Sequence, residues 1–461
     1  MNRSASSLAT IIETVVAPAA GAVDKEGAFP RASIDALAAA GLFALTVPTQ
    51  YGGAGLGPQA AVDLVREIAG VCGSTAMVTG MHYAATGVLI ADDRAEVLEA
   101  IGRGEHLTTL AFSETGSRSH FWAPGSTATA VGDRIRLDAH KSWVTSAQQA
   151  DSYIWSSRPL AAEGPMTLWF VPTSAEGLEI GPEFDGLGLR GNGSTSVRGN
   201  AVEVEPTALI GTDGEGLDFA LASALPWFLL VNAAASAGLI QAVIRDAVAH
   251  VTTSRLEHLG QTLAQQPQTL ARIATMQITA DRTNALLDLA AGRVAAGAED
   301  APLRVLEAKA CADEASAQVA DLAMQVCGGA AFRKELSIER RFRDSRAARV
   351  MAPTQDALAE FIGRAVCGMG ELIDEAALVA LLASGQLAGA ALDTTEQEPL
   401  PADSALWATP GVVITPHVSW FSDSYTRDVV ALFAANIEAL EEGRPLANVV
   451  DRELGFHPLP D

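Results

Sequence analysis

The spacing of apolar and polar positions divides the chain into successive regions of different pattern. Alanine-rich segments with helical spacing come first, at residues 7–16, 31–40, 59–72 and 77–101. Short alternating runs separated by Pro and Gly follow, at residues 108–113, 128–137, 153–156, 167–172 and 201–204. Long helical patterns then return, at residues 217–253, 262–296, 302–326 and 349–366. This order predicts an α+β protein with a helical domain, a β-domain and an antiparallel bundle of four helices.

The β-region contains a hairpin whose last strand carries a candidate binding surface. Residues 128–131 and 134–137 flank the pair Gly132-Asp133, which is a strong turn signal. Further along, Trp143 and Thr145 are two residues apart, so we expect both side chains on one face of the sheet. A flat indole beside a hydroxyl suits an aromatic, hydrogen-bonding cofactor ring. The alternative is a core Trp beside a Thr of the strand ladder.

Composition narrows the classes of function. The chain has 461 residues, 49% of them apolar, with 31 Lys and Arg against 55 Asp and Glu and a formal charge of -24. An acidic balance argues against binding to a phosphate backbone, so no nucleic-acid partner is expected. The four cysteines are far apart, which predicts neither a disulfide scaffold nor a metal site. Lacking a signal-peptide pattern and a long uninterrupted apolar run, the sequence predicts a cytoplasmic protein without a membrane segment.

Six motifs occur in order over residues 20–368: GLFALTVPTQYGGAGLG, AFSE, KSWVTSA, LGLRGNGSTSV, QVCGGAAF and RRFRDSRAARVMAPT. Together they resemble the acyl-CoA dehydrogenase superfamily. The resemblance implies an N-terminal helical domain over residues 1–106, a β-domain over 107–212 and a four-helix bundle over 213–368. It also implies FAD between the last two domains, with FMN as an alternative, and at least a homodimer or homotetramer.

The resemblance assigns flavin-binding roles to particular residues. Two pairs, one from each of two strands, would face the flavin ring: Phe112 with Ser113, and Trp143 with Thr145. Three further elements would meet the cofactor of a neighbouring subunit or close over it: Arg255, the turn containing Gln325, Gly328 and Gly329, and Thr354. Two adjacent glycines allow a backbone to approach a phosphate closely, although they also occur at an ordinary helix end.

The catalytic carboxylate of the family is absent from both places where the resemblance would put it. Desaturation of an acyl thioester needs a base to remove the α-proton, and the two corresponding positions hold Ala352 and Phe228. Asp356 lies four residues beyond Ala352 and is a weak substitute. Glu114 follows Ser113, but adjacent strand residues point to opposite faces, so a structural role is expected. The catalytic residue is therefore unknown, and desaturation is expected to be lost or altered.

An apolar pocket suggests a different use of the same flavin. Relatives of this fold include monooxygenases that receive reduced flavin from a partner reductase, and their chemistry needs a dry cavity. Phe121, Trp227 and Phe228 could line such a pocket, and Ser119 or His120 could hydrogen-bond the oxygenated cofactor. Ser119 also corresponds to a serine that contacts substrate in the family. The alternative is that these aromatic residues belong to the core.

Residues 369–461 resemble the final quarter of D-2-hydroxyacid dehydrogenases. Asp393, Glu398 and His417 match an acidic residue, a histidine-orienting Glu and an acid/base His of that family. The family's substrate-binding Arg should precede Gly370, where the chain has Met369, and no G-x-G-x-x-G phosphate loop is present. We therefore expect a truncated, vestigial half-Rossmann tail that does not bind NAD.

Three functions follow from these patterns. The first is a flavin-dependent oxidoreductase of the acyl-CoA dehydrogenase type, with electron-transfer flavoprotein as a candidate partner. The second is a reduced-flavin monooxygenase that acts on a small organic substrate with a flavin reductase as partner. The third is a catalytically silent flavin-binding or assembly protein.

Overall fold

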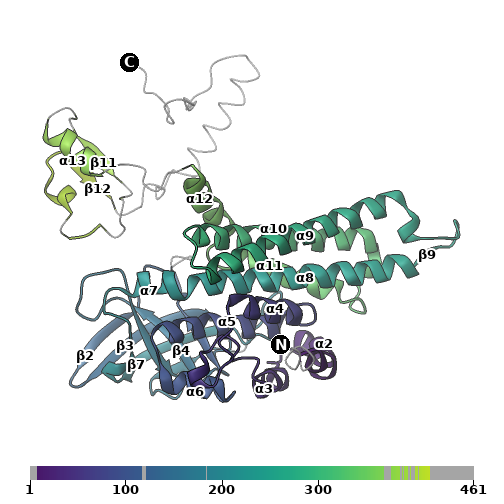
Figure 1. The fold of residues 1–461 in the computed structure, drawn as a ribbon, viewed down its shortest axis with the longest axis horizontal. Helices are drawn as coiled ribbons and strands as arrows, with labels where there is room; N and C mark the ends of the chain where they lie inside the picture. The colour runs from purple at the N-terminus through teal and green to yellow at the C-terminus, as the bar shows by residue number, and fades with distance from the viewer. Residues whose placement is uncertain are drawn as a thin grey trace, which may run out of the picture. The chain divides into compact units, whose positions relative to one another are not determined.

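A computed structural model describes residues 8–116, 121–182 and 184–367, with residues 375–384, 387, 389–392, 395, 400–402 and 404–415 of the tail. The chain divides into two compact units, residues 1–370 and 371–461. The first unit has a helical region, a β-region and a helical bundle in that order, as the apolar pattern predicted (Figure 1). The limits of the individual domains stay predictions.

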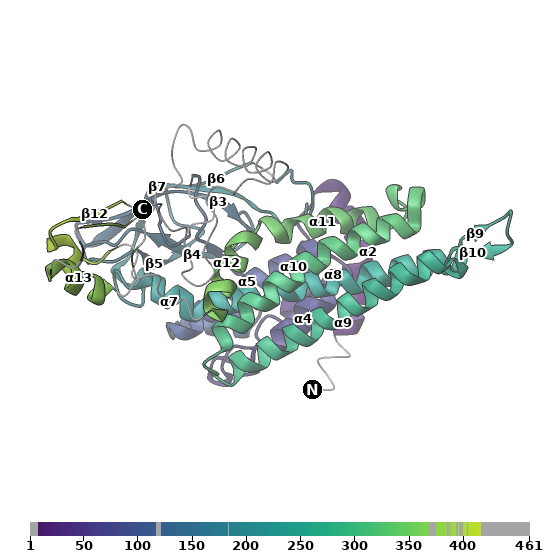
Figure 2. The same ribbon diagram turned by 90° about the horizontal axis from the view of Figure 1, so that it is seen from above.

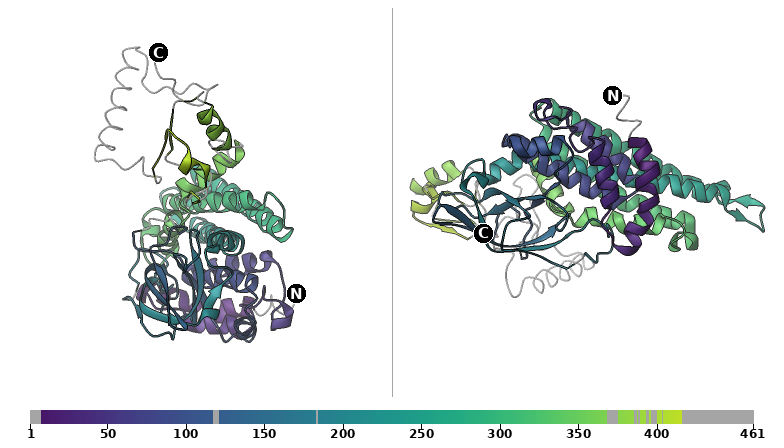
Figure 3. Two further views of the ribbon diagram at one scale, coloured as in Figure 1. Left: turned by 90° about the vertical axis from the view of Figure 1, so that its left-hand side faces the viewer. Right: turned by 90° about the horizontal axis from the view of Figure 1, so that it is seen from below.

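The N-terminal region is built from helices, of which α3 begins after Pro30 and α4 begins after Gly57. In order they are η1 (Ile12–Val16), α2 (Ala17–Glu26), α3 (Arg31–Ala39), α4 (Pro58–Ala69), α5 (Gly73–Ala91) and α6 (Ala95–Gly102). The expected single helix over 77–101 is wrong, because the chain leaves helical geometry between α5 and α6, where Asp93 has a φ of 53°. Helix α5 is buried on nearly all sides. Figure 3 (right) shows helices of this region lying against the bundle.

Two four-stranded sheets form the β-region. One has the order β1-β4-β5-β8, from β1 (Thr108–Ala111), β4 (Ser152–Ser157), β5 (Thr167–Pro172) and β8 (Leu209–Ile210). The other has the order β2-β3-β7-β6, from β2 (Thr127–Val131), β3 (Arg134–Val144), β7 (Thr195–Val204) and β6 (Leu178–Ile180). The predicted hairpin is confirmed, since Val131 pairs with Arg134 and Gly132 has a φ of 62°. Buried side chains of both sheets, among them Tyr153, Trp155 and Val197, form the core.

Long helices form the C-terminal region. They are α7 (Gly216–Ser223), α8 (Leu225–Thr253), α9 (Pro267–Ala295), α10 (Ala301–Cys327), α11 (Ile338–Val350) and α12 (Gln355–Val366). Helices α8, α9 and α10 run side by side (Figure 2), and the hairpin of β9 (Arg255–Leu256) and β10 (Gln261–Thr262) joins α8 to α9. The single helix expected over 349–366 is wrong. Pro353 cannot continue a helix and restricts the residue before it, so α11 ends before the turn and α12 begins after it.

Residues 216–253, which hold α7 and α8, are also long and apolar enough to cross a membrane by length and composition alone. In the structure, 78% of the most apolar window is buried inside the protein. Burial inside the protein therefore accounts for the apolar character of this segment, because a helix that is buried on all sides is apolar all round.

The second unit is described only in part. Within it lie α13 (Glu375–Ala383), β11 (Ala390–Leu392), η6 (Ala405–Ala408) and β12 (Val412–Ile414). The two strands pair in parallel, and Leu378, Leu382, Leu392 and Leu406 form a small core. A parallel pair beside a helix fits an α/β fragment. The expected vestigial residues Asp393, Glu398 and His417 lie outside the described residues.

Candidate functional site

A cavity of about 600 Å³ lies among the β-region, α5 and the bundle in the first unit. Its walls come from the ends of β1 and β3, the connection from β6 to β7, one side of α5, the α7–α8 junction and the end of α11. It brings together seven candidate residues from distant parts of the sequence: Phe112, Ser113, Phe121, Trp143, Thr145, Phe228 and Ala352. Met77 and Met81 of α5 also line it, and sequence reasoning did not identify them.

The geometry that brings Trp143 and Thr145 to the cavity differs from the expected alternation. Strand β3 has a register irregularity against β7 between Lys141 and Val144, and Trp143 adopts a φ of 56°. Thr145 lies just beyond the strand, is buried, and its Oγ1 is 3.1 Å from Ser194 Oγ. The Trp143 side chain is 72% exposed and meets the Phe184 ring edge-on at 6.3 Å. The irregularity in the strand, and not a shared strand face, therefore determines where the Trp143 and Thr145 side chains lie.

Glu114 lines the cavity, but its carboxylate is fixed by neighbours. Lys141 Nζ donates to Glu114 Oε1 at 2.6 Å, and the backbone N–H groups of Gly125 and Ser126 donate to Oε2 at 2.6 and 3.1 Å. Burial alone would raise the pKa of Glu114, but the Lys141 charge and these hydrogen bonds outweigh burial and lower it. A carboxylate held in its charged form by these donors is a poor proton acceptor. The expected structural role fits this geometry.

Lys141 completes this buried group. Its side chain is fully buried, and Nζ also donates to the Ser156 carbonyl at 2.7 Å and to Ser156 Oγ at 2.9 Å. The ammonium lies 5.2 Å from the centre of the Trp155 ring. Burial lowers the pKa of Lys141 to about 8, although Glu114 acts in the opposite direction. Lys141 and Glu114 thus find their hydrogen-bond partners within the β-region. Among the described residues that line the cavity, Glu114 is the single titratable one.

Other predicted residues do not line the cavity. Trp227 packs against α5, where a Cβ added to Gly87 would lie 2.5 Å from its Cδ1, so its assignment to the substrate pocket is corrected. Asp356 is exposed in the first turn of α12, which argues against its use as a base. Arg255 is exposed on β9, at the hairpin between α8 and α9. Ser119 and His120 lie outside the described residues.

The remaining flavin candidates belong to the ends of bundle helices. Gln325 lies near the end of α10, Gly328 and Gly329 belong to the 3-10 helix η5 (Gly328–Phe332), and Thr354 precedes α12. Gly328 has a φ of 56°, a conformation that favours glycine. None of the four is among the described residues that line the cavity of this chain, although Thr354 lies two residues beyond Ala352, which does. Their predicted roles toward a cofactor stay predictions.

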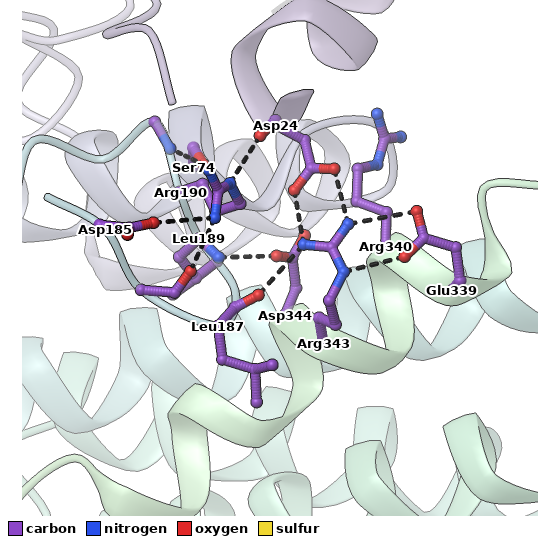
Figure 4. Close-up of polar contacts among 12 residues, drawn as sticks. Asp24, Ser74, Asp185, Leu187, Leu189, Arg190, Glu339, Arg340, Arg343 and Asp344 are labelled. Atoms are coloured by element: carbon purple, nitrogen blue, oxygen red, sulfur yellow. Dashed lines mark hydrogen bonds and ion pairs between the residues drawn. The ribbon is translucent and has the colours of Figure 1, made fainter. Parts of the chain in front are cut away.

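One wall of the cavity is held by a polar network that the sequence did not reveal (Figure 4). The Arg343 guanidinium of α11 donates to both carboxylate oxygens of Asp24 in α2, at 2.8 and 2.6 Å, and to the Leu187 carbonyl at 3.1 Å. The Glu339 carboxylate accepts from Arg343 Nε at 2.8 Å. The bidentate pairing of Arg343 with Asp24 fixes the relative orientation of the two groups as well as stabilising their contact. It ties the 184–194 connection to two distant helices.

The same wall meets a buried carboxylate one residue further along α11. Leu189 N–H donates to Asp344 Oδ1 at 2.7 Å, while Leu189 itself has a φ of 51° (Figure 4). Gly188 lies directly against the helix backbone, since a Cβ there would be 2.5 Å from the Arg343 carbonyl oxygen. Burial raises the pKa of Asp344 to about 6. Gly188 and Leu189 are cavity residues, so this contact shapes the site.

The lining residues fit the ring of a flavin. Aromatic and thioether side chains supply apolar surface, and Ser113, Thr145 and Ser194 supply hydroxyl groups. The exposed Trp143 indole, held at the cavity in a strained backbone conformation, presents an uncovered aromatic face. A cavity of this size and lining suits an aromatic ligand with few polar groups.

The comparisons with known proteins agree with this fold. Three acyl-CoA dehydrogenase family models match the chain: the N-terminal domain at residues 3–96, the middle domain at 109–202 and the C-terminal domain at 214–367. The chain therefore belongs to the acyl-CoA dehydrogenase family. Residues 365–419 match the NAD binding domain of the D-isomer specific 2-hydroxyacid dehydrogenases, which confirms the fused tail.

Individual relatives are distant. Short-chain specific acyl-CoA dehydrogenase of Homo sapiens is 26% identical over 347 residues, 74% of this chain and 83% of the relative. A 3-(aryl)acrylate reductase of Clostridium sporogenes is 26% identical over 355 residues, 75% of this chain and 92% of the relative. Among solved structures, butyryl-CoA dehydrogenase of Megasphaera elsdenii has a TM-score of 0.74 at 20% identity, covering 78% of this chain and 96% of that one. That likeness shows the fold alone.

Proposed function

We propose that the protein is a flavin-dependent oxidoreductase that binds FAD in the cavity and acts without a carboxylate base at the family's two positions. The observation that carries this proposal is the cavity itself, in which Ala352 and Phe228 are both lining residues while Glu114 is paired with Lys141. A bound flavin supplies two-electron oxidation and reduction. The chain supplies binding, orientation and exclusion of water, with no free carboxylate among the described lining residues.

The roles of the cavity residues follow from their chemistry. Trp143 offers an aromatic face against the ring, and the Ser113, Thr145 and Ser194 hydroxyls are hydrogen-bonding groups for its heteroatoms. Phe228 places an aromatic surface where a carboxylate would have met the substrate. Because a positioned general base contributes about 10²–10⁴-fold in rate, acyl-thioester desaturation should be slow by a similar factor.

A second function, oxygenation of a small organic substrate by reduced flavin, is favoured by the apolar lining. Phe112 and Phe121 stack with ring centres 6.3 Å apart, and both line the cavity together with Phe228. Such walls exclude water, which protects reactive oxygen chemistry at a reduced cofactor. This function needs a flavin reductase as partner, whereas the dehydrogenase function needs an electron acceptor such as electron-transfer flavoprotein. A catalytically silent flavin-binding or assembly protein is the third candidate.

Spectroscopy of the purified protein separates these functions. A yellow protein whose flavin band bleaches anaerobically within seconds on addition of an acyl-CoA would select desaturation. Oxygenation that occurs only with NADH and a flavin reductase would select the monooxygenase. Bound flavin with neither reaction would select the silent protein. A colourless protein that does not take up added FAD or FMN would refute all three.

Restoring a carboxylate tests the assignment of position 352. Ala352→Glu should accelerate anaerobic flavin reduction by an acyl-CoA at least about 10²-fold over wild type. Ala352→Gln is the matched control, because it has nearly the same volume and cannot accept the proton. Equal rates for the Glu and Gln variants, or fast reduction in the wild-type protein, would contradict the proposed loss of the base.

The predicted assembly is part of the proposal. None of Arg255, Gln325, Gly328 and Gly329 lines the cavity of its own chain, which favours contact with the flavin of another subunit. Sedimentation of the flavin-loaded protein should therefore give a dimer or tetramer. A monomer that retains flavin tightly would remove these residues from the site. Cytoplasmic location and the absence of NAD binding stay predictions.

A further inference from the structure

The turn that carries Ala352 into the cavity is anchored from behind by one buried lysine. Residues 351–354 join α11 to α12, and Met351 and Ala352 line the cavity. The carbonyl oxygens of Met351 and Pro353, on either side of Ala352, both accept hydrogen bonds from Lys309 Nζ, at 3.2 and 3.1 Å. The turn has no regular secondary structure to pair these carbonyls, so the lysine is their partner.

The lysine is held in place by a carboxylate on its own helix. Asp313 lies one turn along α10, and its Oδ2 accepts from Lys309 Nζ at 2.6 Å. Both side chains are fully buried, and Ser236 of α8 lies 3.5 Å from Asp313 Oδ1. The three protons of the ammonium group match three acceptors: one carboxylate oxygen and two turn carbonyls. The Lys309 ammonium group therefore has an acceptor for each of its protons, and these hydrogen bonds fix its orientation.

A buried ion pair of this kind is poorly explained by stability alone. Desolvation of two charges offsets much of their attraction, and replacement of both by apolar residues of similar size is often neutral or stabilising. A turn-anchoring role accounts for the lysine, because an apolar side chain at position 309 could pack equally well but could not hold two carbonyl groups. The distinguishing property of Lys309 is thus the direction of its hydrogen bonds.

We propose that Lys309 is a positioning residue for the site: it fixes the 351–354 turn as a wall of the cavity, and Asp313 orients it. The relevance of this wall to catalysis rests on the proposed function of the cavity, but the anchoring itself does not. Loss of the lysine should leave α10 in place and release the turn, which changes the surface that Met351 and Ala352 present to a bound molecule.

The test measures exposure of residue 352 in the full-length protein without flavin or substrate. Ala352→Cys is combined with the double replacement Lys309→Met and Asp313→Leu, which removes the pair without leaving a buried charge. The rate of maleimide addition at position 352 is followed by peptide mass spectrometry, which separates it from the four native cysteines. The matched control is Arg346→Met with Asp321→Leu, which breaks a 2.6 Å ion pair between α11 and α10 that does not touch the turn.

The proposal predicts that labelling at position 352 rises at least about tenfold in the Lys309 and Asp313 variant, with an unchanged urea midpoint, and does not rise in the control. The affinity for added FAD should fall by a similar factor in the Lys309→Met and Asp313→Leu variant that keeps Ala352. Equal labelling rates in the two double variants would overturn the proposal. If the apolar pair does not fold, Lys309→Gln with Asp313→Asn is used instead. Failure of both to fold would assign the pair to stability and also overturn it.

A protein that shows the labelling change but binds no flavin would refute the proposed function and leave the anchoring intact. A protein that binds flavin but shows no labelling change would refute the anchoring and leave the proposed function intact. The two conclusions are therefore tested separately.

Discussion

Asp344 should make the stability of the protein depend on pH in a way that one substitution removes. Its carboxylate is 8% exposed, and burial raises its pKa from 3.8 to about 6. The hydrogen bond from the Leu189 N–H lowers this pKa, as do the charges of Arg340 and Arg343, while the Asp24 charge raises it; burial outweighs the opposing effects. The folded protein therefore binds a proton that the unfolded chain releases. The contribution of Asp344 is fully present below about pH 4 and is lost as the pH rises through 6.

The magnitude follows from the difference between the two pKa values. A difference of about two units corresponds to about 3 kcal/mol of unfolding free energy, at 1.36 kcal/mol per unit. About half of this falls between pH 5 and 8, because the unfolded group is already ionised at pH 5 while the folded group is not. Asp344→Asn keeps an oxygen that can accept from the Leu189 N–H and cannot ionise. The wild-type protein should lose about 1.5 kcal/mol more than the variant over this range.

Urea unfolding followed by tryptophan fluorescence at pH 5, 6, 7 and 8 measures this difference. Subtracting the variant from the wild-type protein at each pH removes the contributions of the other titrating groups, provided that they are unchanged. Asp344→Ala controls for the lost acceptor, and it should be destabilised at every pH by about 1–3 kcal/mol, since the Leu189 N–H loses its partner. If the difference in unfolding free energy between the wild-type protein and Asp344→Asn stays constant within about 0.5 kcal/mol from pH 5 to pH 8, the reasoning is refuted.

Three further substitutions test other parts of the site. Lys141→Met should reduce the urea unfolding free energy by about 3–5 kcal/mol, because it leaves the Glu114 charge buried without its cation, and Glu114→Gln in addition should recover part of the loss. Gly188→Ala should cost about 1–3 kcal/mol in the same assay, because its Cβ would approach the Arg343 carbonyl, and an unchanged midpoint would contradict the close packing. Trp143→Ala should leave stability within about 0.5 kcal/mol, since the side chain is exposed, while the Kd for FAD rises about tenfold in a fluorescence titration.

The sequence predicted several elements and seven of the residues that line the cavity, but not the geometry that brings them together. The hairpin at Gly132 was predictable because a two-residue turn is a local signal. The break between α11 and α12 at Pro353 was also local, yet the helical pattern on both sides hid it. Trp143 and Thr145 both line the cavity, although by way of an irregular strand that alternation does not describe.

The sequence by itself determined the succession of helical and β-regions, the absence of a carboxylate at positions 228 and 352, and the fused tail. These properties depend on residue identity and on spacing within single elements. Only the tertiary structure decided that Lys141 holds Glu114, that Arg343 and Asp344 support the cavity wall, and that Lys309 anchors the 351–354 turn. The physical reason is that spacing specifies which face of an element a side chain occupies, whereas buried polar groups find partners through the packing of elements far apart in the chain.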